Sequence, residues 1–131
     1  MNNRKNGNSF EHRLCLSLSA YGFWCHNLAQ NQQGQPFDVI AARNGRSHPI
    51  DCKQCVNDTF KLSRIEENQA SAMTLWEQTG NGDGWFALEM SNGEVYFFTY
   101  FFLASLIQTS LSEAEIKQAG IPLRKWVEKC E

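Results

Sequence analysis

A carboxylate and an ammonium group lie two residues apart in the segment from Ile50 to Cys55. If this segment is an extended strand, alternation directs Asp51 and Lys53 to one face and Cys52 to the other. The carboxylate can bind a hard divalent cation through oxygen, and the ammonium can stabilise charge that develops on a phosphate. Ion pairs of this kind are also common on exposed strands. By itself, this pair favours an ordinary surface contact.

Asp38 changes that interpretation. It lies inside the apolar run from Phe37 to Ala42, which predicts a buried strand. A carboxylate in such a strand is unfavourable unless it is paired or bound to a metal ion. The dipeptide Asn44-Gly45 is a strong turn signal between this run and the next strand, so the two strands can pair and bring Asp38 close to Asp51. Two such carboxylates become compatible when they share a divalent cation.

The surrounding pattern predicts the elements that position these residues. Ser63 with Glu66, and Ser112 with Glu115, form capping-box patterns that open two helices. The expected strands cover residues 23–28, 37–42, 49–55, 85–90 and 95–99, and the expected helices cover 9–21, 63–79, 101–108 and a segment after residue 112. This order predicts an α/β fold with a central mixed β-sheet flanked by helices, in the order αβββαβ.

Length and composition favour one soluble domain. At 131 residues we expect a single domain over 1–131, with a mobile segment over 1–8. The longest apolar stretch, 95–107, is too short for a membrane span, and the first residues do not resemble a signal peptide. Five scattered cysteines do not suggest a disulfide framework. We therefore expect a cytoplasmic protein with reduced thiols and no membrane partner.

The net charge of −2 conceals an asymmetry. Residues 1–64 carry a net charge of +4, and residues 65–131 carry −6. The basic half contains both aspartates and the lysine described above. A basic surface around clustered carboxylates is typical of a protein that handles a polyanionic substrate through a cation, although a charge split of this size also arises by chance.

The motifs resemble those of the PD-(D/E)XK nuclease superfamily. Asp38, followed thirteen residues later by Asp51-Cys52-Lys53, is similar to its catalytic motif. The segment 7–11 resembles its first-helix motif, and the segment 37–41 resembles its second-strand motif. In spacing and compactness the chain most resembles Holliday-junction resolvases of the archaeal Hjc and bacterial RecU kinds. The resemblance implies a restriction-endonuclease-like core.

The resemblance also implies a metal site. Asp38 and Asp51 would bind Mg²⁺ or Mn²⁺, with the backbone carbonyl of Cys52 as a further ligand. Glu11, from the first helix, would complete the acidic cluster as a catalytic and metal-binding residue. The pair Asn8 and Glu11 also fits a helix cap, so a purely structural role for Glu11 stays open.

Two further residues acquire catalytic roles by the same resemblance. Lys53 would position or activate the attacking water, and Gln69 resembles a second-helix glutamine that supports the site in some members. An exposed helix glutamine is the alternative for Gln69. Two departures from the family pattern are visible: Pro36 is separated from Asp38 by one residue, and Asp51 stands where the nearest resolvases usually have Glu.

These observations predict a metal-dependent, structure-selective DNA endonuclease, most like a Holliday-junction resolvase of DNA recombination and repair, acting as a homodimer. The aromatic segment 95–103 is expected in the core, with contact to a second subunit as the alternative. The residues expected to contact DNA phosphates are Arg4, Lys5, Arg13, Arg43 and Arg46. The competing functions are a restriction-type or general DNA nuclease and a catalytically idle DNA-binding module.

Other chemistries have weaker support. Cys52-x-x-Cys55, with His48, Cys25 and His26 in the same chain, raises the hypothesis of a zinc site. Residues three apart in an extended strand point to opposite faces, which does not suit shared tetrahedral coordination. The chain has no GxxxxGK[ST] phosphate loop and no nucleophile-elbow motif. Nucleotide hydrolysis and serine-type catalysis are therefore disfavoured.

Overall fold

The structure is a computed structural model that describes residues 9–28 and 36–130. Within these residues a six-stranded sheet has the order β1-β2-β3-β5-β6-β8, in which β3 and β5 are parallel and the other neighbours antiparallel. Its strands are β1 (Trp24–Asn27), β2 (Val39–Arg43), β3 (Arg46–Gln54), β5 (Trp85–Glu89), β6 (Val95–Thr99) and β8 (Ile121–Pro122). The helices are α2 (Phe10–Ala20), α3 (Glu67–Gln78), α4 (Tyr100–Ala104), α5 (Glu113–Ala119) and α6 (Leu123–Lys129). The predicted α/β fold with a mixed, helix-flanked sheet is confirmed.

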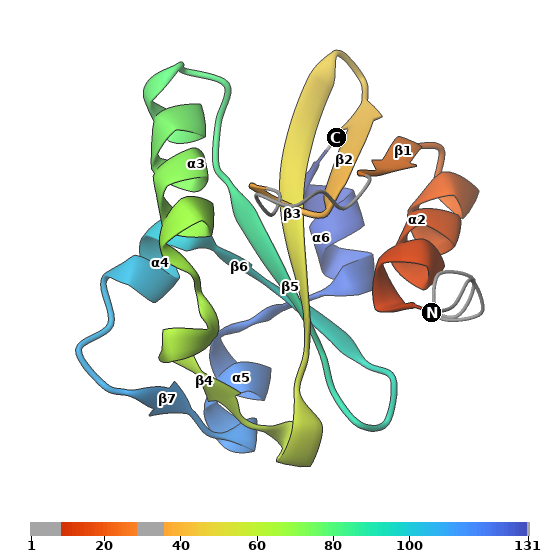
Figure 1. Ribbon diagram of the computed structural model, residues 1–131. Helices are drawn as coiled ribbons and strands as arrows, with labels where there is room; N and C mark the ends of the chain where they lie inside the picture. The colour runs from red at the N-terminus through yellow and green to blue at the C-terminus, as the bar shows by residue number, and fades with distance from the viewer. Residues whose placement is uncertain (1–8, 29–35, 131) are drawn as a thin grey trace, which may run out of the picture.

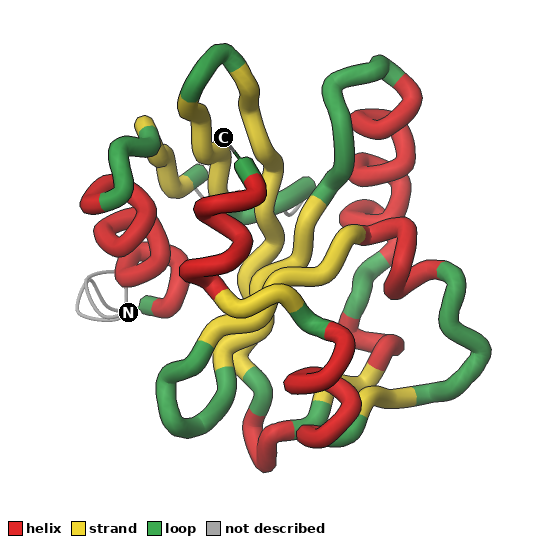
Figure 2. Tube along the Cα trace, turned by 180° about the vertical axis from the view of Figure 1, so that it is seen from behind, coloured by secondary structure: helices red, strands yellow, loops and turns green. Residues whose placement is uncertain are grey.

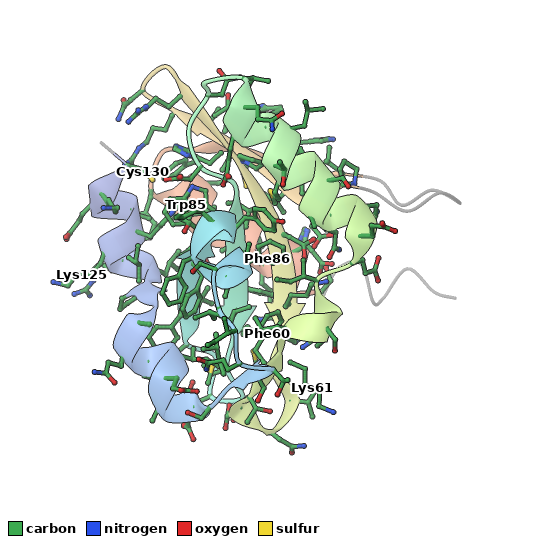
Figure 3. The ribbon with its side chains drawn as sticks, turned by 90° about the vertical axis from the view of Figure 1, so that its left-hand side faces the viewer. Phe60, Lys61, Trp85, Phe86, Lys125 and Cys130 are labelled. Atoms are coloured by element: carbon green, nitrogen blue, oxygen red, sulfur yellow. The ribbon has the colours of Figure 1, made fainter. Side chains whose placement is uncertain are left out.

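Helices cover both faces of this sheet (Figures 1 and 2). Because side chains alternate along a strand, Trp85 faces one hydrophobic core and Phe86 the other (Figure 3). The first core lies under α2 and α6 and includes Phe10, Leu14, Leu18, Val39, Ile50, Phe97 and Trp126. The second core lies under α3, α4 and α5 and includes Phe60, Met73, Leu88, Phe98, Leu103 and Ile116. A sheet buried on both faces explains why β5 and β6 are largely apolar runs.

A two-residue hairpin joins β2 to β3. Asn44 and Gly45 both have positive φ, 57° and 79°, as a type I′ turn requires. The turn sets a register in which Val39 lies opposite Ile50. The turn predicted from Asn44-Gly45 is therefore confirmed, and Asp38 directly precedes Val39, the first residue of β2.

The start of α3 differs from the prediction. The capping box is formed by Glu66 and Gln69 rather than by Ser63 and Glu66. The segment Leu62–Arg64 forms a separate 3-10 turn, and Ile65, with φ −79° and ψ 109°, is extended and interrupts helical continuity. The helix therefore begins at Glu67.

Other boundaries also differ. The helix expected over 101–108 is shorter, because α4 (Tyr100–Ala104) ends at its C-cap, Ser105. Ser9 caps α2 by accepting from the amide of His12, and the proposed cap at Asn8 lies outside the described residues. The capping box of Ser112 and Glu115 is confirmed. The two-residue strands β4 (Phe60–Lys61), β7 (Ser110–Leu111) and β8 are too short to give a periodic signal in sequence. In the described part of the chain, no helix is both long and apolar enough to cross a membrane.

Candidate functional site

Two aspartates lie side by side where β2 begins. The amide of Asp38 donates to the carbonyl of Ile50 at 3.0 Å, although Ile50 is already the partner of Val39, so Asp38 lies one residue out of the β2–β3 register. Oδ2 of Asp38 accepts from the amide of Cys52 at 2.8 Å. Asp51 is completely buried and Asp38 is 8% exposed. The expectation that the hairpin brings the two carboxylates together is confirmed.

Lys53 and Gln69 complete a bonded cluster around Asp51. Nζ of Lys53 lies 3.2 Å from Oδ2 of Asp51 and donates to Oε1 of Gln69 at 3.2 Å. Nε2 of Gln69 donates to Oδ1 of Asp51 at 3.3 Å. The side chain of Gln69 is buried. It contacts both charged residues, so the alternative of an exposed helix glutamine is wrong.

The first turn of α3 holds that glutamine in place. Oε1 of Gln69 also accepts from the amide of Glu66 at 3.0 Å, as the capping box requires. The helix start therefore orients Gln69, which in turn contacts Lys53 and Asp51.

The electrostatics of Asp51 favour a cation. Burial, and then the neighbouring carboxylate of Asp38, raise the pKa of Asp51 to about 8, while Lys53 partly opposes the shift. Its buried Oδ2 faces the ammonium of Lys53 and has no hydrogen-bond partner among the described residues. Two adjacent carboxylates, one with an oxygen lacking a hydrogen bond, form an oxygen-rich donor set that fits Mg²⁺ or Mn²⁺.

Glu11 is not part of this bonded cluster. Within residues 9–28 and 36–130, no group of three His, Cys, Asp or Glu side chains is placed to hold a metal ion. Glu11 lies in the first turn of α2 and acts electrostatically on Cys52, whose thiol pKa is raised by burial and by the three nearby carboxylates. A metal-binding role for Glu11 stays a prediction.

The raised pKa of Asp51 predicts a pH dependence of stability in metal-free protein. The unfolded carboxyl titrates near 3.8 and the folded one at about 8, so between these values the folded state binds more protons than the unfolded state. Stability is therefore highest at the acidic end of this window and falls as pH rises from about 4 to about 8. We expect the Tm in EDTA to fall over this range and the fall to be shallower in Asp51→Asn. Equal slopes for the two proteins would contradict the prediction.

A buried acid missed by the sequence analysis anchors Arg13. Glu89, on β5, is buried and receives both Nη atoms of Arg13, one of them at 3.0 Å. It also accepts from Nε2 of Gln54 at 3.0 Å. This network holds α2 against β3 and β5. In the sequence Glu89 stands in an apolar run, as Asp38 does, and the same signal could have identified it.

The remaining basic residues occupy different environments. Arg43 donates to the carbonyls of Tyr21 at 2.9 Å and Val127 at 2.7 Å, and its guanidinium lies 4.3 Å from the ring centroid of Phe23. Arg46 is exposed beside the β2–β3 turn. Arg4 and Lys5 lie outside the described residues. Contacts of these side chains with DNA stay predictions, and Arg43 also has a structural role.

The Arg43 contacts predict a loss of stability on truncation. Arg43→Ala removes two hydrogen bonds and a cation–π contact, so we expect the free energy of unfolding to fall by about 1–3 kcal/mol. Urea denaturation measures this change. Arg46→Ala is the matched control and should change stability by less than about 0.5 kcal/mol. Equal stability of the two variants would contradict the structural role of Arg43.

The cysteines do not gather around Cys52-x-x-Cys55. The side chain of Cys52 packs against the first core and that of Cys55 lies in the second, which confirms that they point to opposite faces. Elsewhere, Sγ of Cys25 donates to Sγ of Cys15 at 3.1 Å.

Comparison with known proteins decides the family. Residues 1–131 match the sequence profile described as archaeal Holliday junction resolvase (Hjc). The chain belongs to the archaeal Holliday junction resolvase family. The interpretation as a junction-resolving nuclease, made from Asp38, Asp51 and Lys53, is confirmed at this level.

A solved member of the Hjc family has the same fold. The 1.6 Å structure of Archaeoglobus fulgidus Hjc, a Holliday junction resolvase from an archaeal hyperthermophile, matches with a TM-score of 0.72 at 17% sequence identity. The match covers 92% of this chain and 99% of that one. A comparison with curated protein sequences gives no significant match.

Proposed function

We propose that this chain resolves four-way DNA junctions as a homodimer, by hydrolysing phosphodiester bonds with Mg²⁺ or Mn²⁺. The bonded cluster of Asp38, Asp51, Lys53 and Gln69 carries the proposal. It combines an acidic cation site with an oriented ammonium on one face of a rigid sheet. This is the donor set expected for metal-assisted phosphoryl chemistry.

Asp38 and Asp51 are the proposed metal ligands. The backbone carbonyl of Cys52 would be a third oxygen ligand. Cys52 is on β3, two residues after Ile50, which pairs with Val39 of β2. When bound, the cation supplies positive charge that polarises the phosphate and lowers the pKa of water. The two carboxylates would bind this cation. Its positive charge would in turn favour the ionised form of Asp51 over the protonated form.

Lys53 is the residue proposed to act on the attacking water and on the phosphate. Its ammonium is held by Asp51 and Gln69, so it needs little reorganisation to orient a water for in-line attack or to stabilise charge on the phosphate. Gln69 acts as a positioning residue, because it contacts both charged groups.

A cleavage assay on a labelled four-way junction and a linear duplex of matched arm sequence tests the proposal. With Mg²⁺ we expect paired symmetric cuts on the junction, no cuts on the duplex, and no product in EDTA. Equal cutting of both DNAs would indicate a general or restriction-type nuclease. Junction binding without cleavage under Mg²⁺ or Mn²⁺ would indicate an idle DNA-binding module.

The proposed dimer uses the apolar outer face of α3 and α4. Within the aromatic segment 95–103, residues 96–98 are buried, whereas Phe101 is 70% and Phe102 is 37% exposed. Leu75, on the adjacent α3, is 62% exposed. These three exposed apolar side chains lie on two helices that contact each other, and we propose that they contribute to a self-complementary two-fold interface. Two copies would present two sites to the paired strands of a junction.

Charge placed on this surface should separate the subunits. We expect the wild type to sediment as a dimer and Phe101→Glu as a monomer, because a buried unpaired carboxylate opposes association. Leu16→Glu is the matched control, since Leu16 is exposed on α2 across the sheet. A monomeric wild type, or a dimeric Phe101→Glu, would contradict the proposed interface.

A further inference from the structure

An exposed tryptophan lies at the edge of the sheet formed by the described strands. Trp24, on β1, is 63% exposed and stacks on His26, with ring centroids 5.8 Å apart and an interplanar angle of 11°. The two residues are separated by one position, so the pleat directs both to the same face. The stacked pair forms an aromatic platform on the protein surface, and neither residue belongs to a hydrophobic core.

The platform faces the same side of the sheet as the proposed active site. In the β1–β2 register His26 lies opposite Ile40, which in turn lies opposite Pro49 on β3. Asp51 follows Pro49 by two residues on the same strand and therefore lies on the same face as His26. Measured along the strand direction at about 3.3 Å per residue, His26 lies roughly 7 Å from the level of Asp51. Trp24 lies roughly 13 Å from the same level. These separations span about two to four nucleotides of one DNA strand.

The position and chemistry indicate the occupant. We propose that Trp24, supported by His26, stacks on a nucleobase of the DNA that flanks the scissile phosphate at the branch point. This inference rests on the proposed function. Aromatic platforms bind base faces without regard to sequence. Where duplex arms end at a branch, a terminal base pair offers a face that a continuous duplex keeps stacked, so the platform would help select junctions.

Binding measurements in a cleavage-blocked Asp51→Asn background test this contact. The probes are a fluorescein-labelled four-way junction and a linear duplex of the same arm sequence. Adding Trp24→Ala should weaken junction binding by about 5- to 100-fold and leave duplex binding within about twofold. Trp24→Phe, which keeps an aromatic face, should recover most of the junction affinity. Leu16→Ala is the control for loss of an exposed apolar side chain and should bind the junction normally.

Several outcomes would overturn the inference. Unchanged junction affinity in Trp24→Ala would show that the platform does not contact DNA. Equal losses on junction and duplex would show that it does not contact a branch-point base. Conversion of the dimer to a monomer by Trp24→Ala would make the platform a subunit contact. Failure of the proposed function would look different, because the protein with native Asp51 would then leave the junction uncut whatever residue stands at position 24.

Discussion

Asp51→Asn is expected to abolish junction cleavage and to leave junction binding nearly intact. Asn keeps the size of the side chain but removes the charge that would hold the cation beside Asp38. Metal-ion stabilisation of the transition state contributes several kcal/mol, so the loss in single-turnover rate should be on the order of 10³-fold or more. Binding should survive, because phosphate contacts from basic side chains provide most of the affinity for DNA.

The control for this variant is Asp83→Asn, at an exposed aspartate in the loop before β5. It makes the same chemical change outside the bonded cluster and should cleave at the wild-type rate. Cleavage by Asp51→Asn within tenfold of the wild type would remove Asp51 from the metal site. If Asp51→Asn fails to fold, its Tm will be lowered. The metal site would then be tested by measuring the Tm of the wild type as Mg²⁺ is added.

Lys53→Met is expected to reduce the cleavage rate by about 10²–10⁴-fold, the range for a group that assists proton transfer. Met occupies a similar volume without the ammonium, so the Gln69 side chain keeps its position under α3. Without Lys53, Asp51 loses its only opposing charge among the causes of its pKa shift, and its pKa rises further. The pH–rate profile at low Mg²⁺ should therefore move to higher pH.

Single-turnover rates measured against pH and Mg²⁺ separate the two roles of Lys53. Lys61→Met, at an exposed lysine on β4, is the matched control and should match the wild type. A persistent rate deficit at saturating Mg²⁺ supports a direct role in the hydrolytic step. If the cleavage rate of Lys53→Met recovered fully at high Mg²⁺, that role would be contradicted. Lys53 would then affect only the affinity for the metal ion.

Local signals explain why the aspartate pair could be predicted. Asp38 is an acid within an apolar run, and Asn44-Gly45 specifies a two-residue turn, so register follows from chain geometry alone. The alternation that separates Asp51 and Lys53 from Cys52 follows equally from the strand period. These features depend on fewer than twenty consecutive residues.

The helix that supports the pair was harder to place. The segment before α3 offers two overlapping capping boxes, at Ser63–Glu66 and at Glu66–Gln69. The preceding 3-10 turn is held by tertiary contacts, including a hydrogen bond from Arg64 to the carbonyl of Gln54. A local pattern cannot choose between the two boxes when a distant strand decides the geometry. Gln69 was assigned through family resemblance, and the structure supplies its physical contacts.

Long-range pairs could not be obtained from the sequence. Arg13 and Glu89 are separated by 76 residues, and Arg43 and Val127 by 84. Both arginines were assigned to DNA because basic residues near a candidate site are typical phosphate contacts. Their partners are set by how α2 and α6 pack on the sheet, which no periodicity in the chain specifies.

One oxygen atom, Oε1 of Gln69, accepts both from the amide that caps α3 and from the ammonium of Lys53. If the first turn of α3 frays, the side-chain amide of Gln69 would therefore lose its contacts with Lys53 and Asp51 at the same time. Helix ends open locally far more often than whole domains unfold, so the competent fraction of molecules is set by the opening equilibrium of this turn. Hydrogen exchange at the start of α3 and the cleavage rate should then change together when residues outside the site strengthen or weaken that cap.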